Sequence, residues 1–540
     1  MERYGFRRDH SCLAMLIDRF GASSRTVLSA VLLVVVASAP SAAAATVATE
    51  CPDMAKLSLP DTTITSATLV TGASPVPEYC RVLGVLEGTI HFEVALPTTR
   101  WNGKFFYAGG GGFNGTTPSL IQGLTHGYAS ASSDTGHVGR YTDSSSSRST
   151  DASWALDNPQ AQINYGYRAT HLVTVLAKEI VETYYGEAAR RAYWVGCSNG
   201  GKMGLMEMQR YPEDFDGVII GCFVIDRTKL MLSYTWTAQA LAPAPIPPDK
   251  IPVIARATLA ACDAQDGLVD GLVDSPHRCD FDPRTLLCGT DDDECLSPGQ
   301  VEALQKIYGG AKNSAGELLF PGFPPGHEED WARYITGEGT KNSYRASSWQ
   351  WQYNFMRYFV FGTDYDPVKE FDFDTTPAKL KEVAKSQDAP DPDLSAFNAH
   401  GGKLIMYHGW ADHSIPALRT LQYYDDVRKT VGEDATDEFA RLFMVPGLHH
   451  CGGGPGPWSF GGRGQLSLKD DAEHDMLMAL DRWVEEGVAP EKIIGVKFVN
   501  DDPRQGVALT RPLCPYPQAA QYKGSGSINE AANFVCAEPQ

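Results

Sequence analysis

The stretch WVGCSNGG at residues 194–201 decides the fold, because it places Ser198 in a G-x-S-x-G pattern. A β-rich run at residues 192–195 precedes the serine, and good helix formers follow it at residues 202–210. A sharp strand-to-helix turn of this kind lifts a serine hydroxyl out of the sheet surface, where it can act as a nucleophile. We therefore expect an α/β protein in which Ser198 is the candidate nucleophile.

Strands and helices alternate on both sides of this turn, which favours a parallel sheet covered by helices. Apolar residues four positions apart, beginning at Leu172, predict a helix over residues 159–185. The pattern also predicts strands at residues 88–96, 104–108, 217–221, 403–407 and 441–445, and helices at residues 417–430 and 471–486.

The regular alternation stops between residues 226 and 399. Proline clusters, four cysteines and the aromatic run WQWQYNFMRYFVF at residues 349–361 take its place. A chain of 540 residues is also too long for one simple core. We expect an inserted domain at residues 226–399 and a main domain built from residues 46–225 and 400–540. The aromatic run is compatible with a pocket wall and with the core of the insertion.

Residues 1–45 have the pattern of an export signal. Basic residues end at Arg25, an apolar run covers residues 27–39, and small residues suited to cleavage follow. The apolar run is shorter than the ~20 residues that a membrane-spanning helix needs. We predict a secreted or periplasmic protein without a membrane span. The net charge of -20 argues against a nucleic-acid partner, since an acidic chain repels phosphate backbones.

A serine nucleophile needs a base and an orienting acid, and the later strands can supply both. In sheets of this type the acid and then the histidine follow the serine in the chain, each on a loop after a strand. Asp412 follows the expected strand at residues 403–407, and His449 and His450 follow the next one. Asp412 and one of the two histidines therefore complete a candidate triad with Ser198.

Two cysteines flank this candidate triad. Cys197 directly precedes Ser198, and Cys451 directly follows His450. A bond between the two sulfurs would hold the serine and histidine loops together, and it would favour His450 over His449 as the base. Catalysis needs the hydroxyl and the imidazole within hydrogen-bond reach, and a covalent link beside both would enforce that distance.

These residues resemble the tannase and feruloyl esterase family of α/β-hydrolases, whose members share a C-S, D and H-C pattern in this order. The resemblance covers nearly the whole chain after the export segment. It includes WNGK at residues 101–104, the loop at residues 408–412 and RPLCPYP at residues 511–517. It implies an α/β-hydrolase core with a large inserted lid domain, and an exported serine esterase that works through an acyl-enzyme.

The resemblance also assigns roles that spacing alone leaves open. It places one oxyanion-hole donor at the backbone N–H of Gly112 and the other at the N–H of Asn199. Besides Cys197–Cys451 it implies the disulfides Cys51–Cys80, Cys262–Cys279, Cys288–Cys295 and Cys514–Cys536. Cys222, inside an apolar run, is then left as a buried free thiol.

The insertion carries the acidic stretch CDAQDGLVDGLVD at residues 262–274. Its carboxylates recur every three or four positions and would repel one another on a helix, whereas a hard cation with oxygen ligands would join them in a loop. Family members bind calcium at the matching stretch. The resemblance therefore implies a structural calcium ion held by the side chains of Asp263, Asp266 and Asp270 and by the carbonyls of Leu268 and Leu272.

The resemblance indicates small aromatic esters as substrates, with feruloyl, hydroxycinnamoyl or galloyl groups. An alternative within the family is mono(2-hydroxyethyl) terephthalate, whose free carboxylate would need a cation such as Arg345 or Arg357. A second alternative is an inactive binding protein on the same fold, which the complete triad disfavours. The sequence does not indicate an oligomeric state.

Overall fold

The computed structural model describes residues 47–140, 148–289, 294–326, 328–337 and 346–539. The expected export segment at residues 1–45 lies outside these ranges. Within them, no helix combines the length and the apolar character that crossing a membrane requires.

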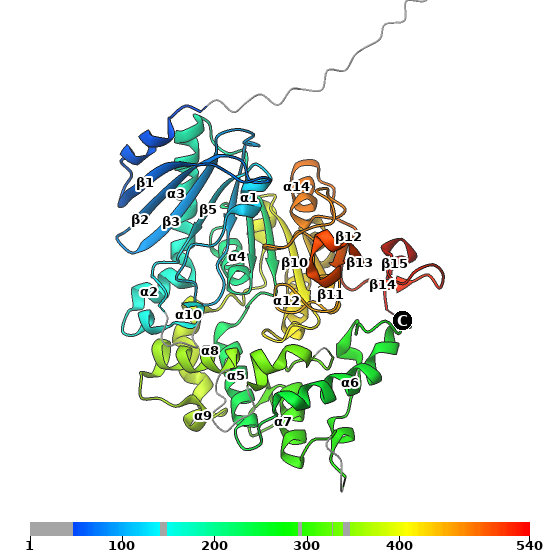
Figure 1. Cartoon of the computed structure of the whole chain (residues 1–540). Coiled ribbons are helices and arrows are strands. Elements are labelled where there is room, and N and C mark those ends of the chain that lie inside the picture. The colour runs from blue at the N-terminus through cyan, green and yellow to red at the C-terminus, as the bar shows by residue number, and fades with distance from the viewer. Residues whose placement is uncertain (1–46, 141–147, 290–293, 327, 338–345, 540) are drawn as a thin grey trace, which may run out of the picture. The chain divides into compact units, whose positions relative to one another are not determined.

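A nine-stranded sheet forms the centre of the molecule, in the order β1-β2-β3-β5-β4-β6-β7-β10-β11 (Figure 1). Antiparallel pairs join β1 to β2, β2 to β3 and β3 to β5, and every later pair is parallel. The predicted parallel sheet is thus confirmed, with an antiparallel edge at its N-terminal side. The strands are β1 (Thr62–Val70), β2 (Tyr79–Leu86), β3 (Ile90–Pro97), β4 (Lys104–Ala108), β5 (Ala129–Ser133), β6 (Arg191–Cys197), β7 (Gly217–Gly221), β10 (Lys403–Gly409) and β11 (Ala440–Val445).

Helices cover both faces of this sheet. One buried cluster joins the sheet to α3 (Ala169–Tyr185), α4 (Asn199–Arg210) and α12 (Ala417–Val431). A second cluster joins the opposite face to α1 (Ile121–Thr125) and α14 (Met476–Glu486). A sheet buried on both faces is what strands as apolar as β7 require.

Two predicted helices differ in their bounds. The helix expected at residues 159–185 consists of α2 (Pro159–Ile163), a π-helical turn (Asn164–Arg168) and α3 in succession. The helix expected to begin at residue 471 begins at Met476, because the Asp475 side chain caps it by accepting from two backbone N–H groups of the first turn.

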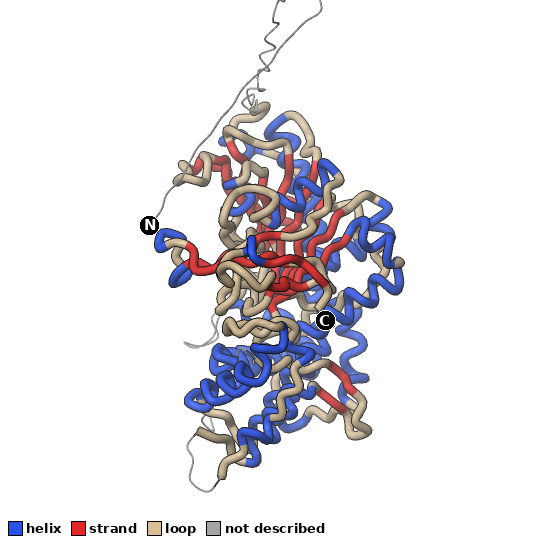
Figure 2. Tube along the Cα trace, turned by 90° about the vertical axis from the view of Figure 1, so that its right-hand side faces the viewer, coloured by secondary structure: helices blue, strands red, loops and turns tan. Residues whose placement is uncertain are grey.

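The segment between β7 and β10, residues 222–402, is mostly helical, and we call it the insertion. β7 pairs directly with β10, so the chain leaves the sheet and returns to the neighbouring position. Figure 2 shows the contrast between the strands of the sheet and the helices of the insertion. The α-helices and strands of the insertion are α5 (Arg227–Leu241), α6 (Ile251–Cys262), α7 (Pro298–Gly309), β8 (Ala311–Lys312), β9 (Leu318–Phe320), α8 (Ser347–Phe355), α9 (Pro367–Glu370), α10 (Lys381–Gln387) and α11 (Ser395–Ala399).

Two hydrophobic clusters contain most of the buried apolar residues of the insertion. One is formed by insertion residues alone, from α5, α6, α7 and the segments after them. The other also takes in Phe113 and Tyr165 of the sheet side, and we call it the boundary cluster. The insertion is therefore packed against the sheet side by aromatic contacts as well as being stabilised internally.

After α12 the chain forms α13 (Glu433–Phe439) before β11, and it ends in two hairpins. These are β12 (Ile493–Phe498) with β13 (Val507–Leu513), and β14 (Ala519–Tyr522) with β15 (Phe534–Ala537). The described residues form five disulfides, and they are the pairs that the resemblance implied: Cys51–Cys80, Cys197–Cys451, Cys262–Cys279, Cys288–Cys295 and Cys514–Cys536. Cys222 is buried and is the free cysteine of the described residues.

Candidate active site

The turn between β6 and α4 holds Ser198 in a backbone conformation that serine rarely adopts, with φ 60° and ψ -122°. Close backbone contacts surround it. A Cβ at Gly196 would lie 2.3 Å from the carbonyl oxygen of Gly200, and a Cβ at Gly200 would lie 2.9 Å from the carbonyl carbon of Gly109. Glycine at positions 196 and 200 is therefore needed for the close backbone packing that positions the Ser198 hydroxyl above the sheet.

Asp412 is buried in the loop after β10. Its Oδ1 accepts from the backbone N–H groups of Ser414 at 2.7 Å and Ile415 at 2.9 Å. Its Oδ2 lies 3.2 Å from His408 Nε2. Burial alone would raise the pKa of the Asp412 carboxyl, but the charge of His450 and the hydrogen bonds from His408 and His450 hold that pKa well below its usual range. Asp412 is therefore an ionised group suited to orient a histidine.

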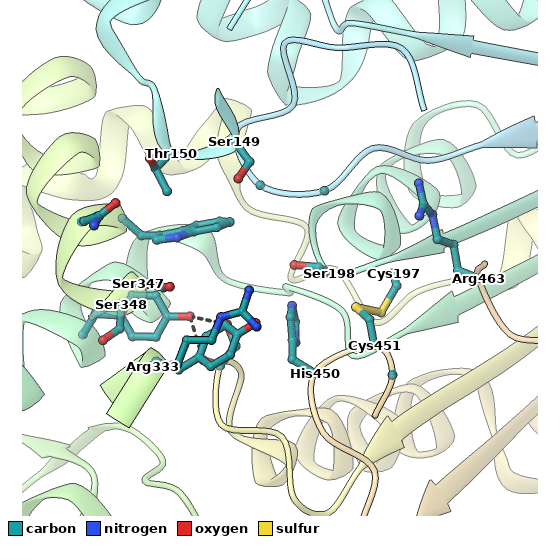
Figure 3. A pocket seen from close by; sticks show the side chains of 18 of the residues that line it. Ser149, Thr150, Cys197, Ser198, Arg333, Ser347, Ser348, His450, Cys451 and Arg463 are labelled. Carbon is teal, nitrogen blue, oxygen red and sulfur yellow. Dashed lines mark hydrogen bonds between the residues drawn. A yellow bond between two sulfur atoms is a disulfide. The ribbon is translucent and has the colours of Figure 1, made fainter. Parts of the chain in front are cut away.

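His450 lies in the loop after β11, and its Nδ1 is 2.9 Å from Oδ2 and 3.1 Å from Oδ1 of Asp412. The neighbouring His449 has another partner, with Nδ1 3.2 Å from Oδ2 of Asp330. His450 and Ser198 line the same cavity, and Figure 3 shows both at its wall. Of the two histidines that the sequence offered, His450 is the one that contacts the acid.

The disulfide between Cys197 and Cys451 joins the serine turn to the histidine loop, with Cα atoms 6.0 Å apart (Figure 3). The two cysteines are 254 positions apart in the chain. Each is the direct neighbour of a candidate catalytic residue, so the link restricts how far Ser198 and His450 can separate. This is the arrangement that the cysteine positions in the sequence led us to expect.

The loop after β4 brings Gly112 to the same cavity as Ser198. Gly112 has φ 66°, and a Cβ there would lie 2.6 Å from the carbonyl oxygen of Ser149 and 3.1 Å from the Trp351 ring. Only glycine fits this position. Asn199 is the first residue of α4, where backbone N–H groups have no partner within the helix. Both positions can therefore offer an N–H group to a bound oxygen.

A buried side-chain network connects these two positions. Tyr165 Oη lies 2.9 Å from the carbonyl oxygen of Gly112 and 2.9 Å from Asn199 Oδ1. Arg227 Nη2 donates to Asn199 Oδ1 at 2.7 Å and to Tyr165 Oη at 3.1 Å. Arg227 belongs to α5, so a residue of the insertion supports the loop that carries Gly112 and the turn that carries Asn199.

Arg227 is fully buried, and its Nε and Nη1 have no hydrogen-bond partner among the described residues. Burial, reinforced by the charge of Arg227, lowers the pKa of the nearby Lys202 well below its ordinary value. Sequence reasoning missed Arg227. The available signal was its place two positions after the apolar stretch at residues 218–225, where a charged side chain must find buried partners.

The cavity at Ser198 and His450 has a volume of about 1100 Å³. The sheet side provides Gly112 and the two candidate catalytic residues, and the insertion provides Tyr234, Arg333, Tyr334 and Trp351. Arg463, from the segment between β11 and α14, also lines it. Figure 3 shows Arg333 and Arg463 on opposite sides of His450. The cavity is large enough for an aromatic ester and has a guanidinium group in each of two walls.

The aromatic run of the insertion divides between the two functions that the sequence left open. Trp351 lines the cavity. Phe355 and Phe359 are buried in the boundary cluster, where Phe359 lies 5.7 Å from the ring of Phe113. The start of the run thus forms pocket wall, and its end forms core.

Of the two arginines considered for a terephthalate carboxylate, Arg357 does not line this cavity. Arg357 lines a separate cavity of about 750 Å³, together with Tyr167 and Lys385. Arg345 lies outside the described residues. Arg333 is the insertion's guanidinium in the wall beside His450, and sequence reasoning did not single it out.

The acidic stretch of the insertion forms a loop after α6. Gly267 and Gly271 have φ 88° and 79°, which allows the chain to turn back on itself. The Asp263 carboxylate accepts from the N–H groups of Asp270 and Gly271 at 3.1 to 3.2 Å. Asp270 Oδ2 also lies 2.7 Å from Nη2 of Arg511 in β13. The loop is therefore fixed both internally and to the C-terminal hairpin.

The chemistry of this loop fits a hard cation. Burial, reinforced by the charge of Asp274, raises the pKa of Asp266 to about 7. The carbonyl groups of Leu268 and Leu272 belong to the same loop. Some acidic, histidine and cysteine side chains of the described residues form groups of three whose possible ligand atoms lie within 4.8 Å of one another. Asp263, Asp266 and Asp270 do not form such a group. A calcium ion here would have to draw these carboxylates closer together.

Comparison with known proteins identifies the family. A family model described as tannase and feruloyl esterase matches residues 72–537. An esterase of Xanthomonas campestris pv. campestris is 38% identical over 539 residues, which span 90% of this chain and 91% of the relative. Mono(2-hydroxyethyl) terephthalate hydrolase of Piscinibacter sakaiensis is 34% identical over 550 residues, spanning 88% and 87% of the two chains.

A solved structure agrees with these matches. The crystal structure of feruloyl esterase B from Aspergillus oryzae is similar with a TM-score of 0.79 at 26% identity, over 90% of this chain and 99% of that one. The similarity thus extends over the sheet and the insertion alike. The chain belongs to the tannase and feruloyl esterase family, has the α/β-hydrolase fold, and is a carboxylic ester hydrolase.

Proposed function

We propose that this hydrolase cleaves esters of aromatic acids through a triad of Ser198, His450 and Asp412. One observation carries the proposal. His450 Nδ1 lies 2.9 Å from the Asp412 carboxylate, and His450 shares a cavity of about 1100 Å³ with Ser198 on its strained turn. A nucleophile, a base and an orienting acid are the three groups that acyl transfer by a serine requires.

The first half of the reaction forms an acyl-enzyme. Ser198 Oγ attacks the ester carbonyl carbon while His450 Nε2 takes the hydroxyl proton, and Asp412 stabilises the resulting imidazolium. The carbonyl oxygen becomes an oxyanion that accepts hydrogen bonds from the N–H groups of Gly112 and Asn199. The tetrahedral intermediate then collapses, and the alcohol leaves with the proton from His450.

The second half releases the acid. Water attacks the acyl carbon while His450 takes one of its protons, the same N–H groups receive the oxyanion, and Ser198 leaves as the hydroxyl. The bond between Asp412 and His450 Nδ1 keeps Nε2 directed at the cavity throughout. The disulfide beside Ser198 and His450 keeps the two groups at working distance.

The insertion acts as a lid domain that shapes the acyl pocket. Tyr234 and Trp351 offer aromatic surface to a planar ring, and Gly112 leaves the space that the Trp351 ring occupies. A calcium ion held by Asp263, Asp266, Asp270 and the carbonyls of Leu268 and Leu272 would stabilise the insertion and supply no group to the reaction.

The substrate class is supported by the relatives as well as by the cavity. The matching family model and the Aspergillus oryzae enzyme both carry feruloyl esterase in their descriptions. The aromatic side chains of Tyr234, Tyr334 and Trp351 in the wall and the volume of the cavity suit a feruloyl, hydroxycinnamoyl or galloyl group.

Mono(2-hydroxyethyl) terephthalate is the second candidate substrate, and Arg333 is the observation that favours it. A guanidinium group in the wall beside His450 can bind the free carboxylate of this substrate by two parallel hydrogen bonds. The Piscinibacter sakaiensis hydrolase, named for this substrate, is 34% identical to this chain.

Turnover of methyl ferulate, methyl gallate and mono(2-hydroxyethyl) terephthalate separates these candidates. We expect kcat/KM to be highest for one of the first two. A preference for the terephthalate monoester that disappears in Arg333→Ala, but not in the matched variant Arg357→Ala, would favour the second candidate. No turnover of any of the three would contradict the proposed substrate class.

We also propose that the protein is exported and that residues 1–45 are removed. Five disulfides support this, because such bonds form and persist in oxidising compartments. The intact mass of the protein recovered from the periplasm or medium tests it. A mass that includes residues 1–45 would contradict the proposed cleavage.

A further inference from the structure

Three metal-binding side chains meet behind the wall of the active-site cavity. Asp330 comes from a short turn of the insertion, His413 from the loop after β10, and His449 from the loop after β11. One ligand atom from each lies within 4.8 Å of the others. His449 Nδ1 is 3.2 Å from Asp330 Oδ2. Side chains from three separate segments thus meet at a single point.

Three of the four histidine nitrogens of this cluster are buried without a hydrogen-bond partner among the described residues. His413 is 2% exposed, and neither of its ring nitrogens has a hydrogen-bond partner among the described residues. His449 is 8% exposed, and its Nε2 is likewise unpartnered. A buried nitrogen without a partner destabilises the folded state unless a further group satisfies it. One nitrogen on each of the two adjacent rings is therefore available to bind a further group.

The rings are held in place by packing. The His413 ring stacks on Tyr334 with centroids 3.9 Å apart, and it meets the His449 ring at 5.0 Å. The two imidazole rings are therefore held beside each other in fixed orientations.

The type and spacing of the donors suit a divalent transition metal. Two imidazoles and one carboxylate are a ligand set of zinc and similar ions, with a fourth position open to water. Two ligands on a tetrahedral ion with bonds of about 2.1 Å are roughly 3.4 Å apart. One donor atom from each of Asp330, His413 and His449 lies within 4.8 Å of the others, so small side-chain movements would bring the three to this separation.

We propose that Asp330, His413 and His449 bind one divalent transition metal ion of the zinc class. This site differs from the calcium loop in its residues and in its nitrogen donors. His413 directly follows Asp412 and His449 directly precedes His450, so the ion ties the insertion to both loops that carry the candidate acid and base. Asp330 is half exposed, which leaves a route for the ion from solvent.

Cobalt(II) is the probe, because its visible absorption reports coordination by nitrogen in a distorted tetrahedral site. The full-length mature protein is stripped with EDTA, returned to excess calcium so that the calcium loop is filled, and titrated with Co²⁺. We expect one equivalent to bind with a visible spectrum, and one equivalent of Zn²⁺ to remove that spectrum. No spectrum at millimolar Co²⁺ would overturn the proposal.

Matched variants locate the site. His413→Phe keeps the ring that stacks on Tyr334, and His449→Leu removes the second imidazole; each should weaken Co²⁺ binding by about 100-fold or more. His474→Gln removes a histidine that pairs with Asp471 elsewhere, and Asp266→Asn alters the calcium loop. Both control variants should bind Co²⁺ with the same affinity as the parent protein. Unchanged Co²⁺ binding in folded His413→Phe and His449→Leu would overturn the proposal.

A second measurement does not depend on the folding of variants. Crystals of the parent soaked in Zn²⁺ should give an anomalous scattering peak between Asp330, His413 and His449. A peak at the calcium loop or at the surface alone would contradict the assignment.

Discussion

The sheet side and the insertion contribute to the active site in different ways. On the sheet side, Ser198, Asp412 and His450 each follow a parallel strand, and backbone geometry with one disulfide sets their positions. The insertion contributes single side chains, such as Arg227 and Trp351, which reach the site from irregularly patterned helices. The proposed chemistry therefore depends on the sheet, while support and selectivity depend on the insertion.

The largest effect is expected at the nucleophile on the sheet side. Ser198→Ala should lower kcat by at least ~10⁴-fold with an unchanged melting temperature, because the remaining groups cannot form the acyl-enzyme. Stopped-flow turnover of the best ester and thermal melting measure the two quantities. Activity within tenfold of the parent would exclude Ser198 as the nucleophile.

The disulfide beside the triad gives the next largest effect. Replacing Cys197 and Cys451 together by Ala should reduce kcat by about 100-fold and change KM far less, because small displacements of catalytic groups are costly. The matched control replaces Cys288 and Cys295, a pair seven positions apart within the insertion. An unchanged kcat in the variant without Cys197 and Cys451 would contradict the proposal that this disulfide positions the catalytic groups.

Substitution of Arg227 tests whether a side chain of the insertion affects the rate of the chemical step. Arg227→Met should lower kcat by ~10-fold to 100-fold with little change in KM, since support of an oxyanion hole acts on the transition state. Arg227→Lys should recover part of the loss. Arg256→Met, at an exposed arginine of the insertion, is the control. A rise in KM alone would assign Arg227 to substrate binding instead.

The proposed calcium ion of the insertion is tested through its effect on the stability of the folded protein. Calcium at 100 times its Kd should stabilise the protein by about 2.7 kcal/mol, and EGTA should remove this gain. Asp266→Asn should make the melting temperature insensitive to calcium, whereas Asp282→Asn, at an exposed carboxylate outside the loop, should not. A parent protein whose melting temperature ignores EGTA would contradict the calcium proposal.

The smallest effect concerns the boundary between the two regions. His137 stacks on Trp154 beside the boundary cluster, and burial lowers its pKa to about 4. The folded state therefore binds fewer protons than the unfolded chain, so stability is complete above pH ~6.5 and falls as the pH drops toward 4, by ~2 kcal/mol at pH 5. His137→Gln should flatten this part of the profile and His400→Gln should not. Identical urea-unfolding profiles for parent and His137→Gln would refute the assignment.

Much of the sheet side could be predicted because its signals are local. The serine turn, the strands and the order of acid and histidine can be read within short windows, and two cysteines indicated which histidine to choose. The start of α14 was predicted too early because residues 471–475, which precede the helix and end in the capping residue Asp475, were counted as part of it.

The contribution of the insertion could not be predicted in this way. Arg227 contacts Asn199 and Tyr165, which lie 28 and 62 positions earlier in the chain. Arg333 reaches the cavity from a π-helical turn, which gives no regular spacing. Such contacts depend on how the insertion packs on the sheet, and spacing along the sequence carries no record of that packing.

Labelling with a fluorophosphonate probe followed by peptide mass spectrometry tests the proposed triad most directly. The adduct should be on Ser198 in the parent, should be absent in Ser198→Ala, and should form far more slowly in His450→Ala, which retains the hydroxyl. An adduct on another residue, or equally fast labelling of Ser198 without His450, would contradict the proposal that this imidazole activates this hydroxyl.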